Sequence, residues 1–161
     1  MRLLQDRERR LDRLADSLRR ADQPAPDIIS AVTQGARTRL PLLNRTGAHA
    51  LQVDRLVDVS AWTDLAIAIV AIELPGWKIR RLLYEDGAWT CSLSKQVNLP
   101  LGWDDTVDAS HQNLPLAILS AFVEVRRRDA ERTAEARTVP QVETMKTDAT
   151  KGDAVCCENF A

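Results

Sequence analysis

The sequence predicts an α+β protein built around one β-hairpin. Asp86-Gly87 suits a type I′ turn, whose two central residues need positive φ, and β-compatible segments lie on both sides of it. One apolar helical segment ends just before this hairpin, and a second begins after the loop that follows it. Because a lone hairpin is marginally stable in water, we expect both helices to pack on it. The expected fold is a small α-β-β-α layered sandwich over residues 58–128, with a helical N-terminal extension and a disordered C-terminal tail.

Residues 1–21 predict an amphipathic helix. Leu4, Leu11 and Leu18 recur every seven residues among arginine, aspartate and glutamate. The repeat is too short for a stable coiled coil, and Arg7 stands where a further apolar residue would be wanted. Two interpretations stay open: a solvated or loosely docked helix, or a helix that associates with a second copy through the three leucines.

Residues 22–57 are interpreted as a linker. Pro24 and Pro26 end the first helix, because proline disfavours helical backbone in the residue before it. A short helix is expected at 27–36, where Gly35 stops it. No packed domain is therefore expected before residue 58.

The first helix of the expected domain begins after Ser60, whose hydroxyl can cap a free backbone N–H, and runs to about Glu73. Pro75-Gly76 then reverses the chain. The second strand alternates regularly, whereas Leu82-Leu83 interrupts the alternation of the first strand. A β-bulge or a short twist in the first strand would explain this irregularity.

Residues 95–109 are expected to form a loop or a third irregular strand. Ser110 or Asn113 can cap the last helix, whose apolar stripe runs from Leu114 to Val125. Residues 129–161 are interpreted as a solvated extension of this helix followed by a polar, disordered tail.

The order of these elements resembles the phage ABA sandwich domain of phage-derived and bacterial proteins. The resemblance rests on Leu74-Pro75-Gly76-Trp77, on Gly87-Ala88-Trp89 and on the segment from Ser110 to Val125. It implies helix layers packed on a small sheet, and it implies no catalytic residues.

The composition narrows the possible functions. The chain has 161 residues and a net charge of −1, which gives no global attraction to nucleic acid or to an anionic membrane. The longest strongly apolar run, Leu65 to Ile72, is far shorter than the roughly 20 residues that span a bilayer. Three cysteines form no even disulfide framework, so we expect a cytoplasmic protein. Motifs for nucleotide cofactors and for zinc knuckles are absent from the sequence, and no cofactor is expected.

Two sets of residues could carry catalysis or metal binding. A cysteine nucleophile needs a nearby base, and Cys91 with His111 is the one such pairing, although alternation places Cys91 on the core face. Oxygen ligands for a divalent cation could come from Asp104, Asp105 and Asp108. Cys91 is interpreted as a buried structural cysteine, the three aspartates as a solvated acidic turn, and Cys156-Cys157 as part of an inert tail. No enzyme is expected.

The alternative function is nucleic-acid binding through a basic strand. Phosphate contacts are expected from Lys78, Arg80 and Arg81, with Tyr84 as an aromatic neighbour and with help from the arginines at 126–128. The favoured function is nevertheless that of a small non-enzymatic accessory or protein-interaction domain. Its expected partner is a protein or a second copy of the chain, and nucleic acid is the less favoured partner because the net charge is close to zero.

Overall fold

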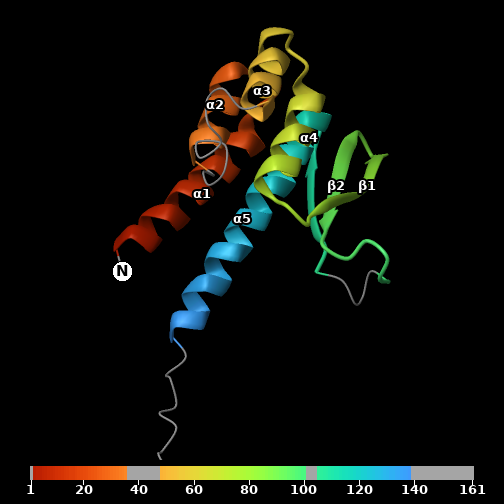
Figure 1. Cartoon of the computed structure of the whole chain (residues 1–161). Coiled ribbons are helices and arrows are strands. Elements are labelled where there is room, and N and C mark those ends of the chain that lie inside the picture. Colours follow the sequence, from red (N-terminus) through yellow and green to blue (C-terminus); the bar gives the residue numbers. More distant parts are fainter. Residues whose placement is uncertain (1, 36–47, 101–104, 139–161) are drawn as a thin grey trace, which may run out of the picture.

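The computed structural model describes residues 2–35, 48–100 and 105–138, and it confirms the predicted α+β class (Figure 1). The elements follow one another as α1 (Arg2–Arg20), α2 (Pro26–Gly35), α3 (Ala48–Asp58), α4 (Trp62–Glu73), β1 (Lys78–Glu85), β2 (Ala88–Ser94), β3 (Val107–His111) and α5 (Leu114–Thr138). Because β3 forms at 107–111, the third strand left open by the sequence is present. The expected disordered tail lies outside the described residues.

The strands form one antiparallel sheet in the order β1-β2-β3. The β1–β2 turn is the predicted one, since Asp86 has a φ of 52° and Gly87 a φ of 80°. Of the two explanations for the irregular first strand, the structure shows the bulge: Ile79 pairs with Leu93 and Arg81 with Ser92, which leaves Arg80 as the extra residue on β1.

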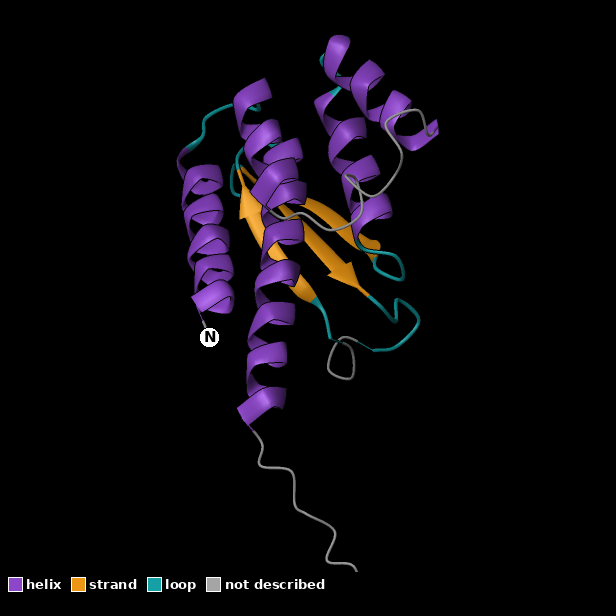
Figure 2. Ribbon diagram, turned by 60° about the vertical axis from the view of Figure 1, so that its left-hand side comes forward, coloured by secondary structure: helices purple, strands orange, loops and turns teal. Residues whose placement is uncertain are grey.

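The described helices lie on one face of this sheet (Figures 1 and 2). Helix α5 contacts β2 and β3 on one side and α1 and α4 on the other, so it lies at the centre of the molecule. Its buried residues include Leu116, Ile118, Leu119, Phe122 and Val125. The sheet contributes Cys91, Leu93 and Val107 to the same hydrophobic cluster.

Helix α1 belongs to this core, which corrects the expectation of a solvated or loosely docked helix. Leu11 and Leu18 are 1% and 0% exposed, and Leu14 is buried beside them. The heptad stripe packs on α5 of the same chain, a partner that cannot be recognised from the local sequence pattern. The side chain of Leu4 lies outside the described residues.

The segment 22–57 is more than a linker. Helix α2 confirms the expected short helix, and it buries Ile29 and Val32 in the same cluster as α1. Helix α3 was not expected; it packs beside α4 through partly buried residues such as Val53 and Leu56. Residues before 58 therefore contribute to the hydrophobic core, contrary to the prediction of a linker.

Ser60 does not cap α4, contrary to the sequence prediction. Its φ of 56° places it in the left-handed region just after α3. The Ser60 N–H donates to the Val57 carbonyl (3.0 Å) and the Ala61 N–H to the Leu56 carbonyl (2.9 Å), as in a Schellman motif. Ser60 therefore ends α3, and Ala61 stands at the start of α4 without a side-chain cap.

The residue that precedes α5 is Asn113, whose carbonyl accepts a hydrogen bond from the Ala117 N–H (2.9 Å). Ser110, the other candidate cap, lies inside β3. Asn113 therefore occupies the N-cap position, but its Oδ1 atom accepts no hydrogen bond from the described residues, so the predicted side-chain cap is not formed. Among the described helices, none is long and apolar enough to cross a membrane.

Candidate functional site

The bulge at Arg80 redistributes the basic strand over both faces of the sheet. Residues that pair directly across two strands point to the same side. Lys78 and Arg81 pair with Ser94 and Ser92, so both lie on the face without helices. Tyr84 pairs with Trp89 and therefore lies on the opposite, helix-covered face. Regular alternation would put Lys78 on the face of Tyr84 and Arg81 on the other face, and the extra residue at the bulge reverses both relationships.

Several of the other cations in the predicted surface are engaged within the chain. Arg80 donates from Nη2 to the Leu99 carbonyl at 2.6 Å. Arg126 is buried against Glu73, while Arg127 and Arg128 form ion pairs with Glu124. The arginines of α5 therefore do not extend the basic strand, and Lys78 and Arg81 remain as its exposed cations.

Cys91 lies in the hydrophobic core with no exposed surface. Burial, with a smaller contribution from the negative charge of Asp108, raises the pKa of its thiol to about 12. The thiol is therefore protonated near neutral pH, whereas a nucleophile needs the thiolate. His111 pairs with Trp89 in the sheet, and its Nδ1 accepts a hydrogen bond from the Asn113 N–H at 2.9 Å. This hydrogen bond gives His111 a structural role at the junction between β3 and α5.

Among the described residues, the predicted acidic ligands Asp105 and Asp108 do not form a metal site. Asp105 forms an ion pair with Arg132, whose Nη2 donates a hydrogen bond to Oδ2 at 2.8 Å. This contact connects the loop before β3 to α5. Asp108 is exposed on β3, and Asp104 lies outside the described residues. No group of three potential metal ligands occurs within 2–35, 48–100 and 105–138. Cys156 and Cys157 also lie outside the described residues.

Leu82, Tyr84 and Trp89 form a partly exposed cluster, here called the aromatic edge. The Tyr84 and Trp89 ring centroids lie 5.1 Å apart, with the ring planes tilted by 47°. Tyr84 is 55% exposed and Leu82 is 37% exposed, although both lie on the helix-covered face. Strand β1 is the outer strand next to β2, and α5 contacts β2 and β3 instead. The helical layer therefore leaves this apolar end of β1 accessible.

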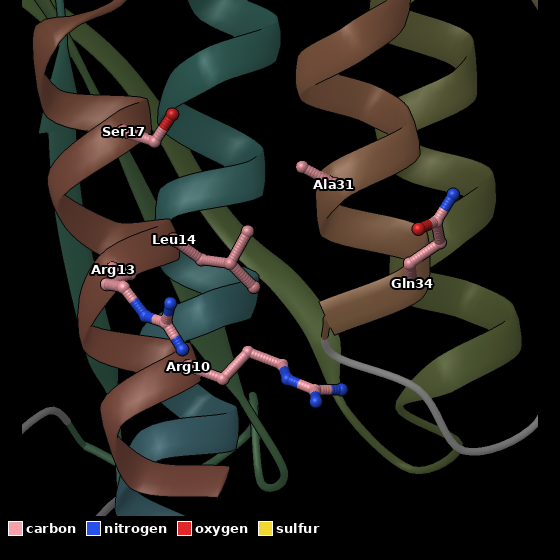
Figure 3. A pocket seen from close by; sticks show the side chains of 6 residues that line it. All are labelled: Arg10, Arg13, Leu14, Ser17, Ala31 and Gln34. Carbon is pink, nitrogen blue, oxygen red and sulfur yellow. The ribbon is translucent and has the colours of Figure 1, made fainter. Parts of the chain in front are cut away.

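A groove of about 560 Å³ lies between α1 and α2 (Figure 3). Helix α1 contributes Arg10, Arg13, Leu14 and Ser17, and α2 contributes Ala31 and Gln34. Figure 3 shows the Arg10 side chain extending from α1 toward α2, with Leu14 directed into the space between the helices. Sequence analysis missed this site, because its two walls become neighbours only when α2 folds back beside α1.

A second cavity of about 480 Å³ lies where α4 and α5 begin. Trp62, Asp64, Asn113 and Pro115 are among its lining residues. The Asn113 Oδ1 atom is buried and has no hydrogen-bond partner among the described residues. Asp64 makes this cavity unfavourable for an anion, despite the two helix N-termini beside it.

Neither family models, nor curated proteins, nor solved structures provide a match to this chain. The resemblance to the phage ABA sandwich domain therefore stays a prediction. The candidate sites are supported by their own geometry alone.

Proposed function

We propose that this protein is a non-enzymatic accessory domain that binds a protein partner through the aromatic edge. The observation that supports this function best is the half-exposed Tyr84 ring, which packs at a tilt against Trp89 at the outer strand of the sheet. Tyrosine and tryptophan are enriched among the residues that contribute most to protein–protein affinity. Because Trp89 holds the Tyr84 ring, a partner would gain contact area with little further loss of side-chain freedom.

The two ends of β1 differ in a way that favours such a contact. Lysine, arginine and bulges on an outer strand discourage pairing with another strand, and Lys78, Arg80 and Arg81 occupy the first half of β1. The second half, which carries Leu82 and Tyr84, is regularly paired with β2 and is apolar. A partner is therefore expected to contact the end of β1 near the turn.

Self-association is a narrower version of this proposal. Leu11 and Leu18 are buried inside the chain, so they are not available to a second copy while α1 is docked. A homodimer would instead use the aromatic edge. Light scattering over a range of concentrations distinguishes the versions, because a strictly monomeric protein would exclude self-association and leave a different protein as the partner.

The test is purification of the full chain from its source cell, followed by identification of the proteins that co-purify. Tyr84→Ala should lose the partner, whereas Val59→Ala should retain it. Val59 is the matched control because it is 72% exposed and lies away from the sheet, between α3 and α4. Equal recovery of the partner with Tyr84→Ala and with the unchanged chain would overturn the proposal.

Nucleic-acid binding is the second candidate, and the bulge favours it in one respect. The extra residue Arg80 brings Lys78 and Arg81 onto the same helix-free face. Against it, Tyr84 lies on the other face and the net charge is −1. Absorbance at 260 and 280 nm on the same preparation tests this candidate. It predicts salt-sensitive binding that weakens in Lys78→Ala and Arg81→Ala, and it fails if no binding occurs at low salt.

The cellular setting is also proposed. The uneven number of cysteines favours a reducing compartment, for which we propose the cytoplasm. The resemblance to the phage ABA sandwich domain is the ground for proposing a phage-derived origin.

A further inference from the structure

Two arginine side chains of α1 line the groove between α1 and α2. Arg10 and Arg13 are exposed, and neither forms an ion pair among the residues that the structure describes. Arg13 donates from Nε to the Arg9 carbonyl at 3.2 Å, which leaves its terminal nitrogens available. Arg19 on the same helix differs, because its Nη1 lies 2.7 Å from Asp16 Oδ1. The α1 side of the groove therefore has a positive potential.

The charge of α1 strengthens this potential. The helix carries seven arginines and four acidic residues, although the whole chain has a net charge of −1. Two like charges three residues apart on a helix repel each other mildly. An anion bound between them would remove that repulsion and accept charge-assisted hydrogen bonds from both guanidinium groups.

The remaining lining residues favour a ligand that also has apolar and hydrogen-bonding groups. Leu14 and Ala31 provide an apolar floor, and Ser17 offers a hydroxyl. Gln34 donates from Nε2 to the Ser30 Oγ atom at 2.8 Å, so its Oε1 is free to accept a hydrogen bond. A ligand with carboxylates, a short aliphatic group and a backbone N–H would satisfy all of these groups.

We propose that this groove binds a short acidic segment of a protein, with its carboxylates on Arg10 and Arg13 and an aliphatic side chain over Leu14 and Ala31. The volume of about 560 Å³ is within the range of ligand sites. A groove between two exposed helix faces suits a peptide better than a small molecule, because small-molecule sites enclose most of the ligand surface. The site is separate from the aromatic edge, and it does not depend on that surface.

The probe is a short fluorescein-labelled peptide in which aspartate and glutamate alternate with leucine and alanine. Its control peptide replaces the acidic residues with asparagine and glutamine. Fluorescence anisotropy with the full chain measures affinity, and amide chemical shifts locate the binding site. The expected result is binding of the acidic peptide alone, with shifts at Ser17, Ala31 and Gln34.

Three arginine variants distinguish a specific groove from the general charge of α1. Arg10→Gln and Arg13→Gln should each weaken binding by about tenfold, since each removes a charge-assisted contact. Arg19→Gln removes the same charge from the same helix, yet it should change affinity by less than about twofold because Arg19 is paired with Asp16. All three side chains are exposed, and circular dichroism verifies that the variants remain folded.

Four outcomes would overturn the proposal. They are the absence of binding, equal binding of the neutral peptide, equal weakening by Arg19→Gln, and displacement of the peptide by inorganic phosphate at a similar concentration, which would identify a small-anion site. Tyr84→Ala should leave peptide affinity unchanged. Failure of this site is therefore distinguishable from failure of the interaction proposed for the aromatic edge.

Discussion

Arg126 of α5 binds Glu73 at the end of α4, with 2.8 Å between Nη2 and Oε2. The two side chains are only 10% and 3% exposed, and Arg126 also donates to the Glu73 carbonyl at 3.2 Å. Burial lowers the pKa of the Arg126 guanidinium, and the negative charge of Glu73 opposes that shift. A single side chain thus connects the last turn of one core helix to the middle of another.

Removing the charge of Glu73 should therefore destabilise the protein strongly. Glu73→Gln leaves a buried guanidinium without its carboxylate, and we expect the free energy of unfolding to fall by about 3–5 kcal/mol. Urea denaturation measures this loss. Glu124→Gln is the control, because Glu124 pairs with arginines that are more exposed and should cost about 1 kcal/mol or less. Equal losses in the two variants would contradict the prediction, whereas the double change Glu73→Leu with Arg126→Met should recover much of the stability.

Cys91 should resist alkylation in the native protein near neutral pH, because its thiol is buried and its pKa is raised to about 12. Iodoacetamide labelling followed by mass spectrometry measures this reactivity. Denatured protein is the positive control, since its exposed thiol should react readily. Rapid labelling of native Cys91 would contradict the burial and would reopen a catalytic role.

The same raised pKa makes stability depend on pH. The ordinary thiol pKa is 9.0 and the folded value is about 12, so between these values the folded state binds more protons than the unfolded state. Stability should therefore decrease as pH rises from about 9 to 12, by at most about 1.4 kcal/mol per pH unit from this group. Below pH 9 the group should contribute no pH dependence. Chemical denaturation of the unchanged chain and of Cys91→Ala checks this, because the variant should show a smaller loss over that range.

Leu18→Ala should show that α1 is part of the core. Leu18 has no exposed surface, and truncation of such a leucine costs about 2–5 kcal/mol. Thermal denaturation should show one transition at a clearly lower temperature. Arg19→Ala, on the exposed side of the same turn, should change stability by less than about 0.5 kcal/mol. An unchanged transition in Leu18→Ala would instead indicate a detached helix.

Gly87→Ala should weaken the hairpin through its backbone alone. Gly87 has a φ of 80°, and an added Cβ atom would meet nothing within 4 Å. The expected loss is about 1–2 kcal/mol, the cost of placing an L-residue with a side chain in the left-handed region. Asp86→Asn should be nearly neutral, because asparagine also tolerates this conformation. A neutral Gly87→Ala would contradict the turn geometry, and denaturation by urea distinguishes these results.

Elements with strong local signals were predictable from the sequence. Asp86-Gly87 predicted the turn, and the leucine stripe predicted α1. The Leu82-Leu83 irregularity indicated a bulge or a short twist, and the bulge lies at Arg80. Helix α3 was missed because it has no fully buried apolar stripe among its described side chains: Val53, Leu56 and Val57 are only partly buried. Strand β3 was left open since Val107 is its single buried residue among small and polar neighbours.

The candidate sites were harder to predict because they depend on relationships between distant elements. Regular alternation along β1 would give the wrong faces for Lys78 and Arg81 relative to Tyr84, because the extra residue at the bulge reverses the alternation. The groove beside Arg10 depends on the approach of α2 to α1, and no local pattern encodes that approach.

The packing of α1 on α5 also affects the order in which the chain can fold during synthesis. More than ninety residues separate the end of α1 at Arg20 from the start of α5 at Leu114. Leu11 and Leu18 leave the ribosome long before the residues of α5, which form the surface that buries them. Contacts between such distant segments form slowly. Until they form, the exposed apolar stripe of α1 promotes aggregation. The nascent chain should therefore be a substrate for chaperones that shield apolar helices until α5 has been translated.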